Sequence, residues 1–325
     1  MLEKVNLDVK LTKAEYQSRW PPLRDRLYDL QRACWENGIP STIVFEGWDA
    51  AGKGTTINRL TQRLDPRGFK LYAIQAPRTT EQHMPWLWRF WLKVPNHGEM
   101  AIFDRSWYGR VLVERVEKLT PEAAWMAAYK DIVDFERTLA DDGYIIIKFF
   151  LHISKKEQRR RFKKIEKDPL ESWHVQPEDW EHHRKYGQYL TATEEMLERT
   201  ETEWGPWTIV EGTDSRYERV KVIETIIRRL EEALRARGIP LPVGPDAAEP
   251  AENPEAGGAI PGEAAGAVQA GPPAAAAGGE PGKPALNRWE NEGGAPTEGS
   301  APSELGGENG QDAKQAAPAP ADKGD

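Results

Sequence analysis

Hydrophobic and polar residues follow two alternating patterns along the first 240 positions: short apolar runs, and longer stretches with helical spacing. The short runs are bounded by turn residues and are too short for helices, so they predict buried strands. The predicted strands cover residues 42–45, 70–75, 100–103, 144–151 and 207–211. The predicted helices cover residues 13–37, 54–64, 80–93, 121–141, 154–166, 177–202 and 215–237. Strands that alternate with helices favour a parallel five-stranded sheet covered on both faces, which is a three-layer α/β domain.

The first predicted helix contains an irregularity. Pro21 and Pro22 interrupt its run of apolar positions. A proline is tolerated in the first turn of a helix, which leaves a start at the prolines as an alternative to a start at residue 13. The segment Gly38-Ile39-Pro40 then predicts where the helix ends.

The composition changes at about Leu241, after which Ala, Gly, Pro and Glu dominate. Such a segment buries too little apolar surface to offset its chain entropy, so we expect residues 241–325 to be a disordered acidic tail. The whole chain has 52 acidic and 44 basic residues, a net charge of -8, and the tail holds 14 and 4 of these. Residues 1–240 therefore carry a net charge of +2, which is compatible with a polyanionic substrate.

The cysteine content and the apolar runs limit the class of protein. Cys34 is the only cysteine, which excludes a disulfide within the chain and a thiolate metal cluster. No stretch approaches the roughly 20 apolar residues needed to span a bilayer, and the N-terminus has no apolar core of signal-peptide length. We expect a cytoplasmic protein that has neither a membrane nor a nucleic acid as its partner.

The segment FEGWDAAGKGTT carries the most informative motif. Gly47 and Gly52-Lys53 have the spacing of a P-loop, with a predicted strand before the motif and a predicted helix after it. Glycines let the backbone curl around a phosphate, and the helix adds the positive end of its dipole. The expected phosphate-binding positions are Gly47, Ala50, Ala51, Gly52, Gly54 and Thr55. The alternative is a glycine-rich turn that binds no ligand.

One position departs from the usual loop, because Gly54 stands where a Ser or Thr normally binds Mg²⁺. Asp49, inside the loop, is the candidate that replaces this ligand, since a carboxylate facing phosphates requires a cation between them. Asp104 follows an apolar strand directly, where ligands bind in parallel α/β folds, and predicts a second metal-binding carboxylate. Arg105 could clamp phosphate oxygens. The alternative is a capping aspartate in a salt bridge with this arginine.

These four candidate catalytic residues, Asp49, Lys53, Asp104 and Arg105, supply metal ligands and positive charge but no general base. A hydroxyl acceptor generally benefits from a base, whereas a phosphate acceptor is already ionised near neutral pH. The residue set therefore favours in-line transfer onto the terminal phosphate of a nucleotide.

A basic helix is predicted at residues 155–167, within a lid that we place at about residues 154–176. We expect two or three of its side chains to contact substrate, and the candidates are Arg160, Arg161, Lys163 and Lys164. The alternative is an ordinary charged surface helix. His182 and His183 are neighbours on a helix and cannot share one metal, so we interpret both as surface residues.

Several long motifs together resemble the polyphosphate kinase 2 family. They are FEGWDAAGKG at 45–54, FDRSWYGRVLVERVE at 103–117 and RRFKKIEKDPLESWHVQPED at 160–179, with AP at 76–77 and LWRFW at 87–91 between them. The resemblance covers about residues 10–235, and its details are most similar to the polyphosphate:AMP phosphotransferase branch, which often occurs as two fused copies.

The resemblance implies a P-loop kinase fold and phosphoryl transfer between inorganic polyphosphate and a purine nucleotide, with Mg²⁺ or Mn²⁺ as cofactor. It assigns metal binding to Asp49 and Asp104, the P-loop lysine to Lys53 and the phosphate clamp to Arg105. Arg160 and Arg161 correspond to lid arginines. A further lid arginine of some members aligns with Ile165, so Lys163 or Lys164 would have to replace that contact. The resemblance also implies a homodimer or a homotetramer.

Two alternative functions stay open at this point. The first is an ATP-dependent nucleoside-monophosphate kinase of the thymidylate kinase type, which shares the FEG-x-D start of the loop. Gly54 and the DRSWYGR segment favour polyphosphate over ATP as the donor. The second is a non-catalytic protein that binds nucleotide or polyphosphate, and the intact set of Asp49, Lys53 and Asp104 argues against it.

Overall fold

The computed structural model describes residues 2–243. Its centre is a five-stranded sheet in which every pair of neighbouring strands is parallel, in the order β2-β3-β1-β4-β5. The strands are β1 (Ser41–Gly47), β2 (Phe69–Ala73), β3 (Met100–Asp104), β4 (Ile145–His152) and β5 (Trp207–Glu211). The predicted three-layer α/β fold with five parallel strands is confirmed, and each strand lies within three residues of its expected bounds.

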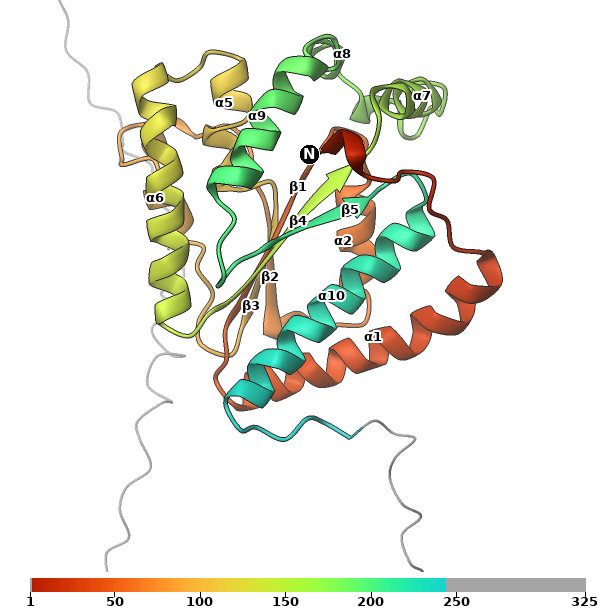
Figure 1. Cartoon of the computed structure of the whole chain (residues 1–325), viewed down its shortest axis with the longest axis vertical. Helices are drawn as coiled ribbons and strands as arrows, with labels where there is room; N and C mark the ends of the chain where they lie inside the picture. The colour runs from red at the N-terminus through yellow and green to blue at the C-terminus, as the bar shows by residue number, and fades with distance from the viewer. Residues whose placement is uncertain (1, 244–325) are drawn as a thin grey trace, which may run out of the picture. The chain divides into compact units, whose positions relative to one another are not determined.

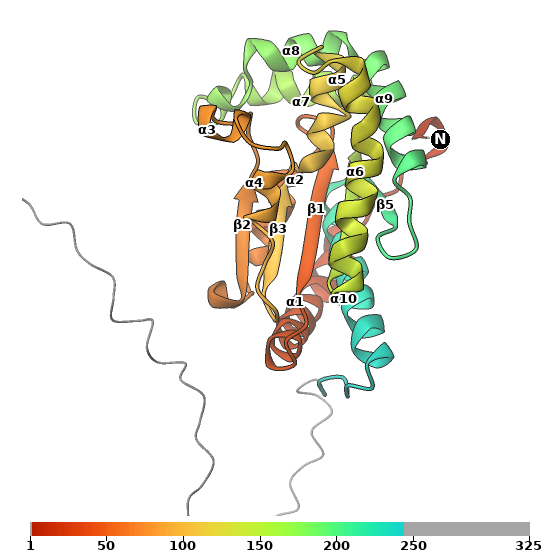
Figure 2. The same ribbon diagram turned by 90° about the vertical axis from the view of Figure 1, so that its left-hand side faces the viewer.

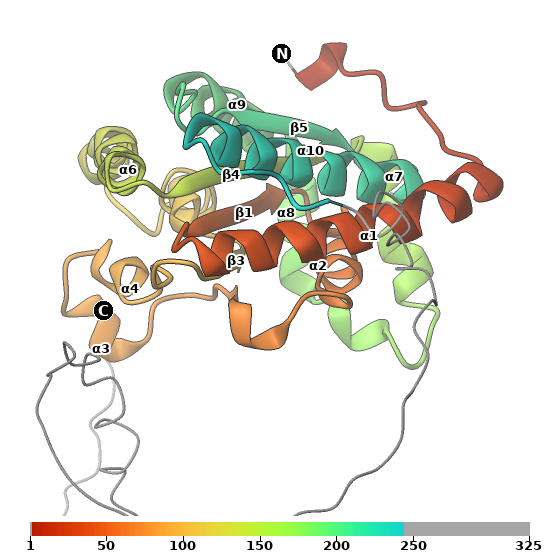
Figure 3. The same cartoon turned by 90° about the horizontal axis from the view of Figure 1, so that it is seen from below.

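The longer helices form the layers on the two faces of the sheet. Helices α1 (Lys13–Glu36) and α10 (Ser215–Ala236) pack side by side on one face, and α6 (Glu122–Asp141) lies on the other (Figures 1 and 3). The remaining helices are η1 (Leu2–Lys4), α2 (Lys53–Thr61), η2 (Pro66–Gly68), α3 (Thr79–Gln82), α4 (Trp88–Trp91), η3 (Trp107–Arg110), α5 (Val113–Val116), α7 (Lys155–Ile165), η4 (Ser172–His174), α8 (Pro177–Arg184) and α9 (Tyr186–Arg199).

The alternative start of the first helix at the prolines is wrong, because α1 begins at Lys13 and runs through Pro21 and Pro22. Thr12 caps this helix in a capping box: its hydroxyl accepts a hydrogen bond from the Glu15 amide, and its own amide donates to the Glu15 carboxylate. Such a cap satisfies two free amides at a helix start.

Two other predicted helices are wrong in their extent. The stretch 80–93 forms two short helices, α3 and α4, with Pro85 between them, since a proline lacks the amide that a continuous helix requires. The stretch 177–202 is divided at Lys185 into α8 and α9, and it ends at Arg199. The division lies two residues before Gly187, and this glycine, which is unfavourable within a helix, is the signal that the sequence carries for it.

The order of the strands positions the functional site. β1 is central, and the chain continues from it toward β2 and β3 on one side before it returns to β4 and β5 on the other. The register aligns Asp104 at the end of β3 with Phe45 of β1. Helices α5, α7, α8 and α9 gather beyond the carboxyl ends of the strands (Figures 1 and 2). The switch in strand order therefore lies beneath these helices, which is where open α/β sheets bind ligands.

The C-terminal tail predicted at 241–325 lies almost wholly outside the described residues. Within them, Leu241 packs against the core and the Pro242 carbonyl accepts a hydrogen bond from Arg26. The domain predicted at 1–240 thus makes contacts slightly beyond that boundary. Among residues 2–243, no helix has both the length and the apolar character that a membrane span requires.

Candidate active site

The loop between β1 and α2 has the backbone of a phosphate-binding turn. Gly47 and Gly52 have φ angles of 142° and 120°, and Ala50 is left-handed at 58°. A Cβ atom on Gly47 would lie 2.4 Å from the Leu151 carbonyl oxygen, and one on Gly52 would lie 2.7 Å from a Glu218 carboxylate oxygen. Gly47 is therefore required by the neighbouring backbone as well as by its φ angle, and Gly52 is required chiefly by its φ angle.

Lys53 is the first residue of α2, and its side chain returns into the loop. Its ammonium group donates hydrogen bonds to the carbonyls of Gly47, at 2.9 Å, and Trp48, at 3.1 Å. The residue is buried, with 8% of its surface exposed. The charge is thus fixed beside the loop amides, where a phosphate would be bound.

Asp49 and Arg105 meet across the loop. Arg105 donates to the Asp49 carboxylate at 2.6 Å, and the His182 ring nitrogen lies 3.4 Å from its other oxygen. Burial would raise the pKa of Asp49, but the hydrogen bond with His182 and the charges of Arg105 and Lys53 outweigh it and hold the pKa well below its usual value. The carboxylate is therefore ionised at neutral pH, and the Arg105 side chain remains 47% exposed.

Asp104 lies over the first turn of α2. A Cβ atom on Gly54 would lie 3.7 Å from a carboxylate oxygen of Asp104. The carboxylate therefore faces the position from which a Ser or Thr at residue 54 would project. A carboxylate oxygen thus stands close to the place of the hydroxyl that the loop lacks.

One cleft of about 960 Å³ joins these groups. Its wall includes the predicted residues Asp49, Ala50, Ala51, Gly52, Lys53, Gly54, Thr55, Asp104, Arg105, Arg160, Arg161 and Lys164. Gly47 borders a separate, smaller cavity, and Lys163 borders neither. Two carboxylates, a P-loop lysine and basic side chains of α7 thus share one concave surface.

The smaller cavity, of about 80 Å³, lies on the other side of the Asp49–Arg105 pair. Both members of the pair line it as well as the cleft. Its other walls are mostly apolar or aromatic, with Trp48, Leu112 and Tyr189 among them. The pair therefore stands at the junction of a highly charged cleft and a largely apolar cavity.

The two arginines of α7 that were predicted to contact substrate differ in their contacts. Arg160 pairs with Glu157 and is 63% exposed. Arg161 is 16% exposed, pairs with Glu157 as well, and donates to the loop carbonyls of Ala50 and Ala51, at 2.9 and 2.7 Å, and to the carbonyls of Gly212 and Thr213. In this structure Arg161 fastens α7 to the back of the P-loop.

The sequence model of the polyphosphate kinase 2 (PPK2) family matches residues 10–238, most of the described chain. The chain belongs to the polyphosphate kinase 2 family. The resemblance drawn from the motifs is therefore confirmed.

Relatives within the polyphosphate kinase 2 family are similar over the same region. A polyphosphate:AMP phosphotransferase of Pseudomonas aeruginosa is 43% identical over 72% of this chain and 47% of its own length. An ADP-polyphosphate phosphotransferase of the same organism is 36% identical over 68% of this chain and 73% of its own. The chain spans about half the length of the first of these.

Two crystal structures of polyphosphate kinase 2 proteins have the same fold. One from Pseudomonas aeruginosa has a TM-score of 0.70 and 44% identity, over 72% of this chain and 50% of that one. One from Arthrobacter aurescens has a TM-score of 0.70 and 28% identity, over 75% and 88%. The second match shows that the described domain corresponds to most of a polyphosphate kinase 2 chain.

The interpretation of His182 and His183 as surface residues is wrong. The His183 ring lies 2.7 Å from the Gln158 side chain and is buried, and His182 faces Asp49. Both rings lie in the last turn of α8, which packs against α7. The hydrogen bond with Asp49 raises the pKa of His182.

His182 also belongs to a group of possible metal ligands in the polyphosphate kinase 2 domain. Ligand atoms of Asp49, Asp179 and His182 lie within 4.8 Å of one another, and Asp104 is outside this group. The sequence did not indicate Asp179 as a metal ligand, beyond placing it at the end of the 160–179 motif. Burial and the nearby charge of Asp49 raise the pKa of Asp179.

Proposed function

We propose that this protein transfers a phosphoryl group between inorganic polyphosphate and a purine nucleotide, with AMP as the preferred acceptor and ADP as a second one. The observation that carries the proposal is the single cleft that holds Asp49, Lys53, Asp104 and Arg105 beside the basic helix α7. The name of the 43% identical relative supports AMP, and the name of the 36% identical relative supports ADP.

The sizes of the two cavities limit where the substrates can bind. The wide cleft is lined by the loop, Lys53 and the side chains Arg160 and Lys164, and it suits a polyanionic chain. The small cavity, of about 80 Å³, is below the size of a nucleoside pocket. Both substrates would therefore occupy the wide cleft, with the acceptor phosphate at Arg105.

The transfer needs little from the protein beyond position and charge. An oxygen of the acceptor phosphate attacks the terminal phosphorus of polyphosphate, a new P–O bond forms, and the bond to the next phosphate of the chain breaks. Lys53 and the loop amides hold the phosphoryl oxygens, and Arg105 holds the acceptor phosphate. No residue has to remove a proton, because the acceptor oxygen is already ionised.

Asp49 and Asp104 would hold the magnesium ion, with manganese as a substitute. The donor set fits this ion, because both groups supply carboxylate oxygens and the Gly54 position leaves Asp104 facing the loop. When bound, the ion neutralises charge on the two phosphates. Arg105, which pairs with Asp49, is the residue that would release this carboxylate to the ion and turn toward phosphate.

The deciding experiment supplies polyphosphate and AMP with no ATP and measures ADP by chromatography. We expect ADP to form with MgCl₂, and EDTA to abolish the reaction until excess Mg²⁺ restores it. ADP formation only when ATP replaces polyphosphate would overturn the proposal in favour of a nucleoside-monophosphate kinase. A panel of AMP, ADP, GMP and GDP ranks the acceptors.

The remaining expectations concern the state of the protein in the cell. We propose that it is cytoplasmic and assembles as a homodimer or a homotetramer. Light scattering coupled to size-exclusion chromatography measures the assembly, and a mass of one chain at micromolar concentration would contradict it.

A further inference from the structure

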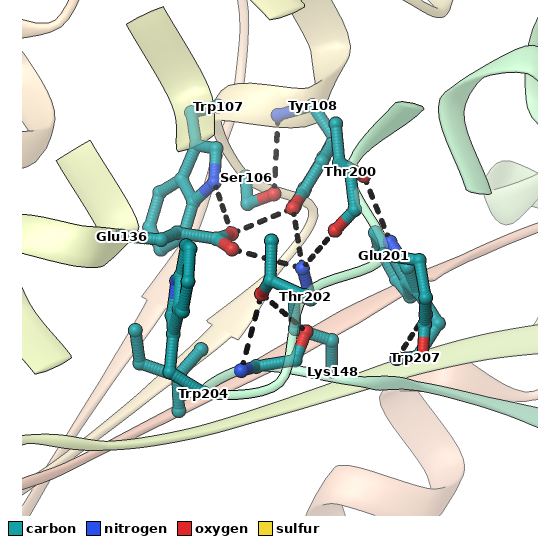
Figure 4. Close-up of polar contacts among 12 residues, drawn as sticks. Ser106, Trp107, Tyr108, Glu136, Lys148, Thr200, Glu201, Thr202, Trp204 and Trp207 are labelled. Carbon is teal, nitrogen blue, oxygen red and sulfur yellow. Dashed lines mark hydrogen bonds and ion pairs between the residues drawn. The ribbon is translucent and has the colours of Figure 1, made fainter. Parts of the chain in front are cut away.

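A fully buried charged cluster lies beneath the segment that carries Asp104 and Arg105. Lys148, in the middle of β4, pairs with Glu136 of α6 at 2.8 Å, and neither side chain has any exposed surface. Figure 4 shows the two groups facing each other, together with Trp107 and Tyr108 of η3. The remainder of β4 is also buried, so a lysine stands where an apolar residue would normally pack.

Every hydrogen-bonding position of the ammonium group is used. Lys148 donates to Glu136, to the Tyr108 hydroxyl at 3.0 Å and to the Thr200 carbonyl at 2.8 Å. The other Glu136 oxygen accepts from Tyr108 at 2.6 Å and from the Trp107 ring at 3.0 Å. The cluster therefore joins β4, α6, η3 and the end of α9 through groups whose directions are fixed.

Stability alone does not account for such a pair. The cost of removing two charges from water offsets much of their attraction, and apolar residues of similar volume are often equally or more stabilising. A saturated polar cluster restricts geometry more than an apolar contact does, because each bond has a required direction. The cluster is thus suited to fixing the place of η3.

The position of η3 is transmitted directly to the active site. The Tyr108 amide donates to the Ser106 hydroxyl at 3.3 Å, and that hydroxyl donates to Glu46, next to the P-loop, at 2.8 Å. Arg105, between Ser106 and the end of β3, has a left-handed φ of 62°. This conformation is unfavourable for a residue with a side chain and persists only when its neighbours enforce it.

We propose that Lys148, Glu136 and Tyr108 are positioning residues that hold Arg105 in its strained conformation, aimed at Asp49 and the phosphate cleft. The proposal rests on the proposed function, because its readout is phosphoryl transfer. Without the cluster, η3 would shift and the Arg105 backbone would relax, while the Lys53 side of the cleft would keep its shape.

The first test removes one hydroxyl. Tyr108→Phe deletes two hydrogen bonds of the cluster, and Tyr144→Phe, the matched control, deletes the bond that a distant tyrosine donates to the Pro95 carbonyl at 2.8 Å. We expect kcat to fall about 10- to 100-fold in Tyr108→Phe, as misplaced catalytic groups produce, and to stay within about twofold in the control. Equal activities in the two variants would overturn the proposal.

The second test separates positioning from stability. The double substitution Lys148→Met with Glu136→Gln removes the ion pair at similar volume, and Arg105→Ala is measured in the wild-type and in this background. We expect Arg105→Ala to lower kcat about 100-fold in the wild-type and less than about tenfold in the double variant. In the double variant the displaced Arg105 already contributes little to kcat, so its removal has a smaller effect. The same fold loss in both backgrounds would refute the coupling.

Two controls keep the outcome interpretable. Wild-type activity with polyphosphate and AMP must be present; its absence would count against the proposed function and not against the cluster. If the double variant does not fold, as shown by circular dichroism, the same cycle is run with Tyr108→Phe as the background, where the Lys148–Glu136 pair is intact. Additive effects of Tyr108→Phe and Arg105→Ala there would overturn the proposal.

Discussion

Charged residues differ in their role on the two sides of the P-loop: the front, with Asp49 and Arg105, and the back, with Arg161 and Glu218. At the front, the Arg105 side chain donates a hydrogen bond to Asp49 and stays half exposed. At the back, Arg161 donates to four backbone carbonyls, and Glu218 is 1% exposed and accepts a hydrogen bond from Thr56 at 2.5 Å. The front groups are available to a ligand, whereas Arg161 and Glu218 also line the cleft but already have partners within the fold. Substitutions at the front should therefore change rate, and those at the back should change stability.

The largest effects are expected at the front. Asp104→Asn removes a proposed metal ligand, and Lys53→Ala removes the charge beside the loop amides. We expect each to lower kcat about 1000-fold or more, since electrostatic stabilisation dominates such sites. The melting temperature should be unchanged in Asp104→Asn and lower in Lys53→Ala, because the buried lysine also donates to the Gly47 and Trp48 carbonyls. Steady-state kinetics and differential scanning fluorimetry measure the two quantities. Lys130→Ala, on an exposed lysine of α6, is the control, and retained turnover in Asp104→Asn would refute its metal role.

A smaller effect is expected when Arg105 is replaced by a residue that keeps the positive charge but lacks the planar guanidinium group. Arg105→Lys should lower kcat about 10- to 100-fold, because a lysine cannot hold a phosphate bidentately. Arg63→Lys, in an exposed pair with Asp25, is the matched control and should leave activity unchanged. Wild-type kcat in Arg105→Lys would show that Arg105 acts only as a point charge.

The back of the loop should respond differently. Arg161→Ala removes the four bonds donated to backbone carbonyls and the ion pair with Glu157. We therefore expect a loss of about 2–4 kcal/mol in the free energy of unfolding, with a smaller fall in kcat than Arg105→Ala gives. Chemical denaturation measures the change, and Arg159→Ala, on an exposed neighbour, is the control. If Arg161→Ala leaves the free energy of unfolding unchanged but abolishes turnover, Arg161 acts on the substrate, as the front residues do.

A pH effect on stability is expected from Glu218. Burial, opposed by the Thr56 hydrogen bond, raises the pKa of Glu218 to about 7. Because the folded state holds this proton more tightly than the unfolded state, stability should decrease as pH rises from about 4.5 to 7, by up to about 3 kcal/mol. Glu218→Gln should remove this decrease, as urea denaturation at pH 5 and pH 7.5 would show. Parallel pH profiles of the two proteins would contradict the assignment.

The smallest effect is expected from the C-terminal segment. Truncation after Val243 should leave kcat and both KM values within about twofold, because the last described contacts with the domain are those of Leu241 and Pro242. Truncation after residue 240 should lower the melting temperature by a few degrees, since it removes these contacts. A loss of activity in the longer variant would give the segment a role in catalysis.

The sequence was sufficient to predict the sheet and the place of the P-loop between β1 and α2. Apolar runs of four to eight residues have few alternatives to buried strands, and the P-loop motif couples its ligands to a fixed backbone. The back of the loop could not be predicted in the same way. Arg161 lies in a run of three arginines, and nothing in that run indicates that this one turns toward carbonyls 110 positions earlier in the chain.

The same limit applies to His182, Glu218 and the Lys148 cluster. Each is defined by a partner that is distant in sequence, such as Asp49 for His182 and Glu136 for Lys148. A lysine within a buried strand was the one visible anomaly, since charged residues are rarely buried without a partner. The partner itself lies on another element, and only the packing of α6 against β4 identifies it.

The first glycine of the loop has an implication for how such motifs are used in sequence surveys. Any larger residue at position 47 would push against the backbone of the adjacent strand at Leu151, whether or not phosphate is bound. A homologue that had lost its enzymatic role would still need glycine there to keep its sheet intact. The presence of Gly47 therefore indicates that the fold is kept, whereas the presence of Lys53 and Asp104 is the better criterion for an active enzyme.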